Sequence, residues 1–248
     1  MTRKKIIQYA GIIIVLISVF FIYWFNFSKP ISFPPNEQLV EEINSQFPEA
    51  NASIIQDAIH LDERHVLVPF VSKSGDYSLS YWLWDNRKWE VSRVSTKGNP
   101  MVWKLNKNNP SSYYFVWNIH PDDQVNSIDY YLIKDRYYFI SSGTHHYDPR
   151  IQMKMQVSLQ EKTYGVEPIP NEWIELMNSL SKVESAKQPM PFLNQFYQSY
   201  SMYFGWLPVD ELGNELFPER SVNGNGYSSS KVNLDYLMIL NKSELELP

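Results

Sequence analysis

Cysteine is absent from the 248-residue sequence. Without a thiol, the protein has no cysteine nucleophile, no disulfide bond and no cysteine for a metal site or a lipid anchor. A chain of this length can bury a hydrophobic core that stabilises it without disulfides. Among exported proteins, the absence of cysteine is typical of the bacterial envelope and not of small secreted animal domains.

Motifs that specify a catalytic mechanism are absent as well. The sequence contains neither G-x-S-x-G nor H-E-x-x-H, the signatures of common serine hydrolases and zinc proteases. S-x-x-K begins at Ser179 and at Ser228, but the companion motifs of penicillin-binding enzymes are missing. Because a pair of catalytic carboxylates leaves no spacing signature, an envelope hydrolase that uses carboxylates or a histidine site stays open as an alternative.

The sequence also lacks an excess of basic residues. The formal net charge is −5, and the part after residue 26 is more acidic than the whole chain, because Arg3, Lys4 and Lys5 precede it. Nucleic acids and anionic lipid headgroups are bound by basic surfaces. The charge therefore argues against both classes of partner.

The most distinctive feature that is present is the uncharged, largely apolar run from Ile6 to Phe25. About 20 apolar residues are the length that a helix needs to cross a bilayer. The run predicts a transmembrane helix over 6–25, and the basic residues before it predict a cytoplasmic tail over 1–5. No small-residue cleavage site follows, which favours a retained anchor over a signal peptide. The predicted localisation is the cell membrane, single-pass, with the bulk of the chain extracytoplasmic.

Residues 26–35 and 36–47 have the signals of a stalk and of a short helix. Three prolines between 30 and 35 predict a stiff stalk just outside the membrane. Asn36 is suited to cap a helix that runs to about Phe47, with apolar residues at helical spacing, and Pro48 would end it. We expect an extracytoplasmic domain over 36–248.

From residue 52 to about 159 the dominant period is two, which indicates β-strands. Asn86 and Arg87 can form a turn that pairs Trp84 with Trp89 and Trp82 with Val91. Short links between successive strands favour antiparallel neighbours. We therefore expect the part from 36 to 165 to be β-rich, with a meander of seven to nine strands.

The pattern changes after residue 165. A helix is predicted from Asn171 to about Val183, and a second from about Pro191 to Phe204 with Gly205 as its C-terminal cap. The residues from 232 to 240 fit a strand or a helix. The predicted fold class is α+β: a transmembrane helix, then an antiparallel β-meander domain with a C-terminal helical hairpin packed on the sheet, and short strands within 166–248.

Aromatic residues give the first candidate binding site. Trp82, Trp84 and Trp89 would share one face of a hairpin, where they could stack on a sugar. The alternative is that this face is the core, since large aromatic side chains fit strands and carry much apolar area. Exposed tyrosines in pairs such as Tyr137 and Tyr138 are a weaker version of the same hypothesis.

His145, His146 and Asp148 give a candidate metal site. They follow a predicted strand, and the preceding Ser-Gly predicts a loop for them. In a loop, their side chains could converge on one metal ion. Their spacing matches no known zinc motif, so solvated loop residues are the alternative. No cofactor is predicted.

These observations predict a membrane-anchored, non-catalytic binding or interaction module of the bacterial cell envelope. One alternative is a protein that binds cell-wall polysaccharide or peptidoglycan, because aromatic residues are abundant. The other is the hydrolase described above. The expected partners are the membrane and another envelope protein or a cell-wall polysaccharide, and no nucleic acid.

Overall fold

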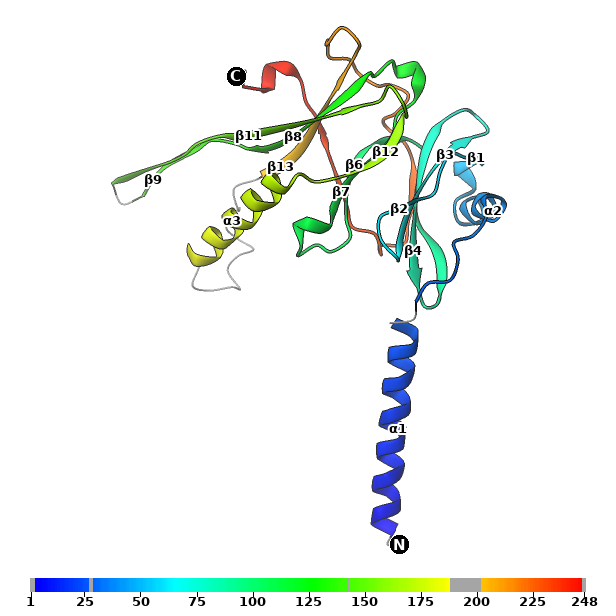
Figure 1. Cartoon of the computed structure of the whole chain (residues 1–248). Coiled ribbons are helices and arrows are strands. Elements are labelled where there is room, and N and C mark those ends of the chain that lie inside the picture. The colour runs from blue at the N-terminus through cyan, green and yellow to red at the C-terminus, as the bar shows by residue number, and fades with distance from the viewer. Residues whose placement is uncertain (1–2, 27–28, 142, 188–201, 247–248) are drawn as a thin grey trace.

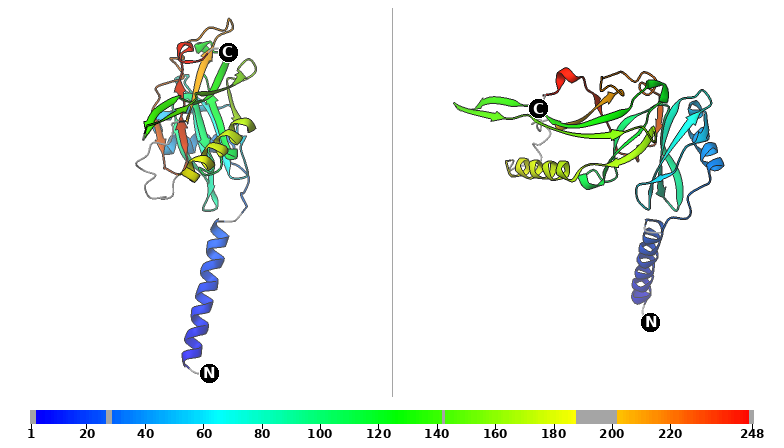
Figure 2. Two further views of the ribbon diagram at one scale, coloured as in Figure 1. Left: turned by 90° about the vertical axis from the view of Figure 1, so that its left-hand side faces the viewer. Right: turned by 45° about the horizontal axis from the view of Figure 1, so that its top comes forward.

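The computed structural model describes residues 3–26, 29–141, 143–187 and 202–246 (Figure 1). Within these residues the protein is rich in β-structure and contains three α-helices. The helices are α1 (Arg3–Asn26), α2 (Asn36–Gln46) and α3 (Asn171–Lys187). Helix α1 runs away from the β-rich body, while α2 and α3 lie against it (Figures 1 and 2).

The prediction of a transmembrane helix is wrong. Among the described residues, no helix combines the length and the apolar character needed to cross a bilayer. The predicted single-pass localisation depended on that helix and is corrected with it.

The first sheet follows the predicted hairpins. Its strands are antiparallel in the order β1-β3-β4-β5-β14, and β2 also pairs with β3. The predicted register is confirmed, because Trp84 lies opposite Trp89 and Trp82 opposite Val91. Asn86 and Arg87 both have positive φ, the requirement of a type I′ turn. The strands are β1 (Ala52–Ile55), β2 (Ile59–His60), β3 (His65–Ser72), β4 (Tyr77–Asp85), β5 (Lys88–Ser95) and β14 (Gly226–Ser228).

Two further four-stranded sheets make up the rest of the body. The middle sheet has the order β12-β7-β6-β15, and the third has the order β11-β8-β13-β16. The middle strands are β6 (Gly98–Lys104), β7 (Tyr113–Asn118), β12 (Tyr164–Pro168) and β15 (Leu234–Tyr236). Those of the third sheet are β8 (Ser127–Lys134), β11 (Ile151–Ser158), β13 (Met202–Val209) and β16 (Met238–Ile239).

The three sheets pack in layers, and alternate residues of each strand enter different cores. In β3, Val66 and Val68 pack with α2 on the outer side, whereas Leu67 packs with Trp103 of the middle sheet. The other face of the middle sheet packs on the third sheet and on the start of α3. Because successive side chains of a strand point to opposite faces, strands buried on both sides read as nearly continuous apolar runs.

The predicted fold class is wrong in its helical hairpin as well as in its transmembrane helix. Helix α3 begins where predicted, at Asn171, and ends at Lys187. Most of the predicted second helix lies outside the described residues, but Tyr203, Phe204 and Gly205 belong to strand β13. Both faces of β13 are buried, so its apolar residues do not alternate with polar ones and their spacing also matched a helix.

Candidate functional site

The three tryptophans of the β4–β5 hairpin are in the core. Trp82, Trp84 and Trp89 expose 1%, 5% and 9% of their surface and pack with the buried residues of α2. The residues before α2 also cover them: Trp89 Nε1 donates a hydrogen bond to the Ile31 carbonyl, and the Phe33 ring meets Trp82 and Trp89 edge-on. A sugar would reach these rings only if this cover moved away.

His145, His146 and Asp148 lie in strand β10 (Thr144–Asp148), not in a loop as predicted. Neighbouring residues of a strand point to opposite faces. His145 accordingly meets Tyr138, while His146 stacks on Phe139 on the other face, with ring centroids 4.5 Å apart. Asp148 forms an ion pair with Lys134 at 2.6 Å. Nowhere among the described side chains do three potential metal ligands gather.

Strands β9 (Tyr137–Ser141) and β10 form a two-stranded ribbon that continues β8 and β11 away from the body (Figures 1 and 2). The register does not shift along this long hairpin: Ser158 pairs with Ser127, Ile151 with Lys134 and Asp148 with Tyr137. The pairing is interrupted at 135–136 and 149–150 and resumes in the same register in the ribbon.

One face of the ribbon is apolar and exposed. We define the ribbon face by Tyr138, Ile140, His145 and Tyr147. Tyr138, Ile140 and Tyr147 expose 54%, 57% and 67% of their surface, and His145 is exposed too. No lysine, arginine, aspartate or glutamate occurs from 137 to 147. An exposed apolar patch of this kind on an otherwise charged protein is typical of an interaction surface.

Charged groups gather instead at the base of the ribbon. Besides the Lys134–Asp148 pair, Arg150 lies 3.6 Å from Asp135 and donates a hydrogen bond to the Glu244 carbonyl at 2.8 Å. The C-terminal residues are thereby bound to the start of the ribbon. This arrangement fixes the direction in which the ribbon leaves the body.

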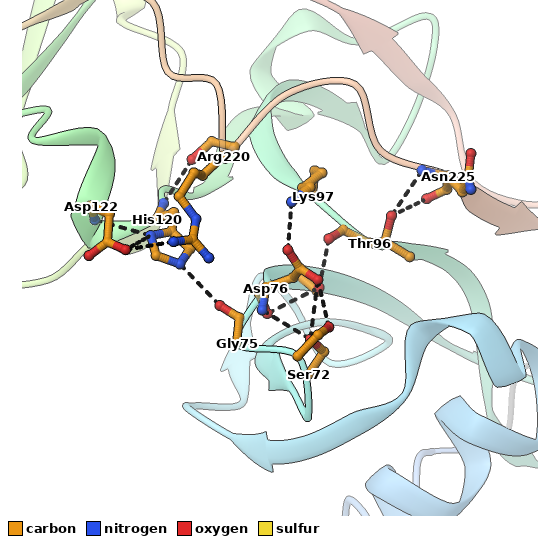
Figure 3. Close-up of polar contacts among 12 residues, drawn as sticks. Ser72, Gly75, Asp76, Thr96, Lys97, His120, Asp122, Arg220 and Asn225 are labelled. Atoms are coloured by element: carbon orange, nitrogen blue, oxygen red, sulfur yellow. Dashed lines mark hydrogen bonds and ion pairs between the residues drawn. The ribbon is translucent and has the colours of Figure 1, made fainter.

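A second group of polar side chains joins the first sheet to the loop 219–225 (Figure 3). Lys97 Nζ lies 2.6 Å from Asp76 Oδ1, and Ser74 donates to the other carboxylate oxygen. The Lys97 ammonium holds the pKa of the Asp76 carboxyl below its ordinary value, although partial burial acts in the opposite direction. Thr96 exchanges two hydrogen bonds with the backbone of Asn225.

His120 belongs to the same junction and uses both ring nitrogens within the protein. Its Nδ1 accepts a hydrogen bond from the Asp122 backbone at 3.0 Å, so the neutral ring donates from Nε2 to the Gly75 carbonyl at 3.1 Å. Arg220 binds Asp122 at 2.7 Å. The side chains of this junction hold each other and thus serve the packing of the body.

A surface hollow of about 500 Å³ lies between 124–126 and 210–212 and contains two carboxylates, Asp210 and Glu211. Asp210 accepts hydrogen bonds from the backbones of Leu212 and Asn214 and from the Asn214 amide. These bonds, those from Asn214 first, lower the pKa of the Asp210 carboxyl. A general acid needs a raised pKa, so Asp210 is suited to holding its turn and not to donating a proton.

The exposed side of the ribbon was only partly visible in the sequence. The pair Tyr137–Tyr138 indicated that one ring lies on each face, but the Ser-Gly before His145 suggested a loop. The uncharged stretch from 137 to 147, flanked by charges at 134–136 and 148–150, is the signal that would have found it. No protein-family model, curated protein or solved structure matches the chain.

Proposed function

We propose that this protein is a non-catalytic binding module whose contact surface is the ribbon face. The observation that carries the proposal is the exposure of Tyr138, Ile140 and Tyr147 on an uncharged ribbon with a fixed base. Tyrosine supplies a large, rigid contact area and is enriched where protein interfaces bind most tightly.

The polar groups of the body support a non-catalytic role. Carboxylates with shifted pKa values, such as Asp76 and Asp210, are held in their ionised form by hydrogen bonds or by a cation. Acid–base catalysis by a carboxyl pair uses one group with a raised pKa. Both carboxylates have partners within their own turn or sheet, so their contacts stabilise the fold.

The proposal is tested by placing a photocrosslinking amino acid at Tyr147 of the full chain. Irradiation in cells that carry the gene is expected to yield a covalent product with a protein. Leu212 is the matched control, because it is apolar and 86% exposed but lies away from the ribbon. A product from position 147 and not from 212 supports the proposal. If position 147 yields no product under conditions in which the protein is present, the proposal is wrong.

Polysaccharide binding is a second candidate, favoured by one observation. Tyr138 and Tyr147 lie directly opposite each other and both rings are largely exposed, which is a suitable platform for stacking on sugar rings. Sedimentation of the protein with insoluble polysaccharide tests it. Retention that is lost on changing both tyrosines to serine would support this candidate, and the absence of retention would exclude it.

A further inference from the structure

We propose that residues 241–246 form a strap that sets the direction of the ribbon, and that the ribbon pivots at its base when this strap is released. The pivot consists of residues 135–136 and 149–150, where the pairing of the two strands is interrupted. The purpose of the movement rests on the proposed function, because a pivoting ribbon would present the ribbon face to a partner in different directions.

The interruption at the base of the ribbon removes the backbone support of the hairpin at one place. Lys134 is paired with Ile151 on the body side and Tyr137 with Asp148 on the ribbon side, and the residues between them lie outside both ladders. Pro149 contributes to the interruption, because proline has no N–H to donate to a ladder. A two-stranded ribbon has little stability of its own. Its direction therefore depends on the side chains that bridge the interruption.

Ion pairs within the hairpin form the first bridge. Lys134 Nζ lies 2.6 Å from Asp148 Oδ2, so this pair joins the last body residue of one strand to the first ribbon residue of the other. Inside the interruption, Arg150 lies 3.6 Å from Asp135. The pivot is thus held by side chains where ladder hydrogen bonds are interrupted.

The strap forms the second bridge, because it binds both the body and the pivot. The side chain of Gln152, in β11, donates to the Glu246 carbonyl at 2.9 Å and accepts from the Glu246 backbone N–H at 3.0 Å. Arg150 donates to the Glu244 carbonyl at 2.8 Å, and Arg136 pairs with the Glu246 carboxylate. The ribbon therefore cannot turn at its base without breaking bonds to the strap.

The contacts of the strap are weak enough to open while the body stays folded. Among the strap residues only Leu245 is partly buried, packed against a cluster of the third sheet, and the others are exposed. The side chains of Arg136 and Glu246 are 64% and 50% exposed, and exposed ion pairs contribute little individually. Segments with few buried apolar contacts open locally before the whole protein unfolds. Strand β8 is buried along its whole length, so release of the strap would leave the sheet intact.

A small rotation at the pivot would move the ribbon face by several ångströms. The ribbon has five residue pairs, which span roughly 17 Å at about 3.3 Å per residue. A rotation of about 20° would therefore displace its tip by about 6 Å. With the strap bound, Tyr138 and Tyr147 are presented in one direction, and release of the strap would let them reach a range of directions.

Distance measurements between spin labels test the inference. Because the sequence has no cysteine, two introduced cysteines are the only sites that a thiol-specific label can reach. One pair is placed at Thr144 of the ribbon and Leu212 of the body, which are both exposed. A reference pair at Lys88 and Leu212 lies entirely in the body. Pulsed EPR of the full chain measures the distribution of distances for each pair.

The wild-type chain is expected to give one narrow distribution for the ribbon pair. The double substitution Arg150→Ala and Gln152→Ala removes the hydrogen bonds that join the strap to these two residues. It should broaden or shift the distribution by about 6 Å or more, without a change for the reference pair. The matched control, Arg220→Ala with Gln160→Ala, removes hydrogen bonds of the same residue types away from the ribbon and should change neither distribution. Gln152→Ala alone should broaden the distribution less, and it decides the test if the double variant does not fold.

Two results would overturn the inference. One is a folded strap variant whose ribbon pair keeps the wild-type distribution, which would mean that the backbone alone sets the direction of the ribbon. The other is a wild-type distribution as broad as that of the variant, which would mean that the strap does not hold the ribbon. Neither result affects crosslinking from Tyr147, so the inference can fail while the proposed function stands. Conversely, broadening in the variant without any crosslinked product from Tyr147 would refute the proposed function and leave the role of the strap intact.

Discussion

Two hairpins of this protein carry aromatic pairs in the same cross-strand arrangement and have opposite surroundings. In the β4–β5 hairpin, Trp84 lies opposite Trp89 and both are buried. In the ribbon, Tyr138 lies opposite Tyr147 and both are exposed. The difference comes from what covers each hairpin: α2 and the residues around Phe33 cover the tryptophans. Aromatic pairing thus stabilises a hairpin locally, while elements distant in sequence decide whether it becomes core or surface.

The difference in burial between the two hairpins is tested most directly by truncating one aromatic side chain in each. Trp82→Ala should lower the free energy of unfolding by about 3–5 kcal/mol, because a large buried ring leaves a cavity and its Nε1 loses a hydrogen bond to Ser80. Tyr138→Ala should change it by less than about 0.5 kcal/mol, as is usual at exposed positions. Urea unfolding followed by circular dichroism measures both. A large loss for Tyr138→Ala would mean that the ribbon is covered within the molecule.

Acid should destabilise the body through Asp76, whose carboxylate is paired with Lys97. The pKa of the Asp76 carboxyl is lowered by Lys97 from an ordinary value of 3.8, so the folded state binds this proton less readily than the unfolded state. The resulting stability is present above the unfolded value and is lost as the pH falls through 3.8 and below it.

Asp76→Asn should therefore lower the unfolding free energy at pH 7 by about 1 kcal/mol and should flatten its decline between pH 5 and 3. Thermal melts at a series of pH values measure this. The matched control is Asp235→Asn, whose partner Lys104 lies elsewhere in the body. An Asp76 variant with the same acid dependence as the wild type would contradict the assignment.

The smallest expected effect on stability comes from removing one hydroxyl group from a buried and from an exposed tyrosine. Tyr130 of β8 is fully buried, in contrast to Tyr138 of the ribbon, and its hydroxyl has no hydrogen-bond partner among the described residues. Since an unpaired buried hydroxyl is unfavourable, Tyr130→Phe should raise the unfolding free energy by up to about 1 kcal/mol. Tyr138→Phe should leave it nearly unchanged. Destabilisation by Tyr130→Phe would show that the hydroxyl is paired.

Local patterns predicted the parts of the fold that depend on neighbouring residues. The turn at Asn86 and Arg87, the tryptophan register and the strand from Ile151 were predicted because turn chemistry and alternation act over a few residues. The positions of α2 and α3 were predicted from their apolar spacing and from Asn36 and Asn171 as caps, although each helix begins at the asparagine itself and not after it.

The parts that failed depend on burial by distant segments. Strand β13 is apolar on both faces, so its pattern did not distinguish a strand from a helix. The histidines of β10 were predicted in a loop, because nothing near His145 shows that β11 continues in register past Pro149. The candidate site is defined by the exposure of the side chains on the ribbon face, and composition alone does not predict which side chains are exposed.

The register is the same on both sides of the unpaired residues 135–136 and 149–150, and this constrains how the projection can change. Removing one residue from β9 ahead of Tyr138 would turn the side chains between that point and the tip to the opposite side, so Tyr138 would change faces while Tyr147 of β10 kept its orientation. Adding two residues to each strand would preserve the orientation and carry the end about 7 Å farther out. Length at this hairpin is therefore adjustable only in even, matched steps.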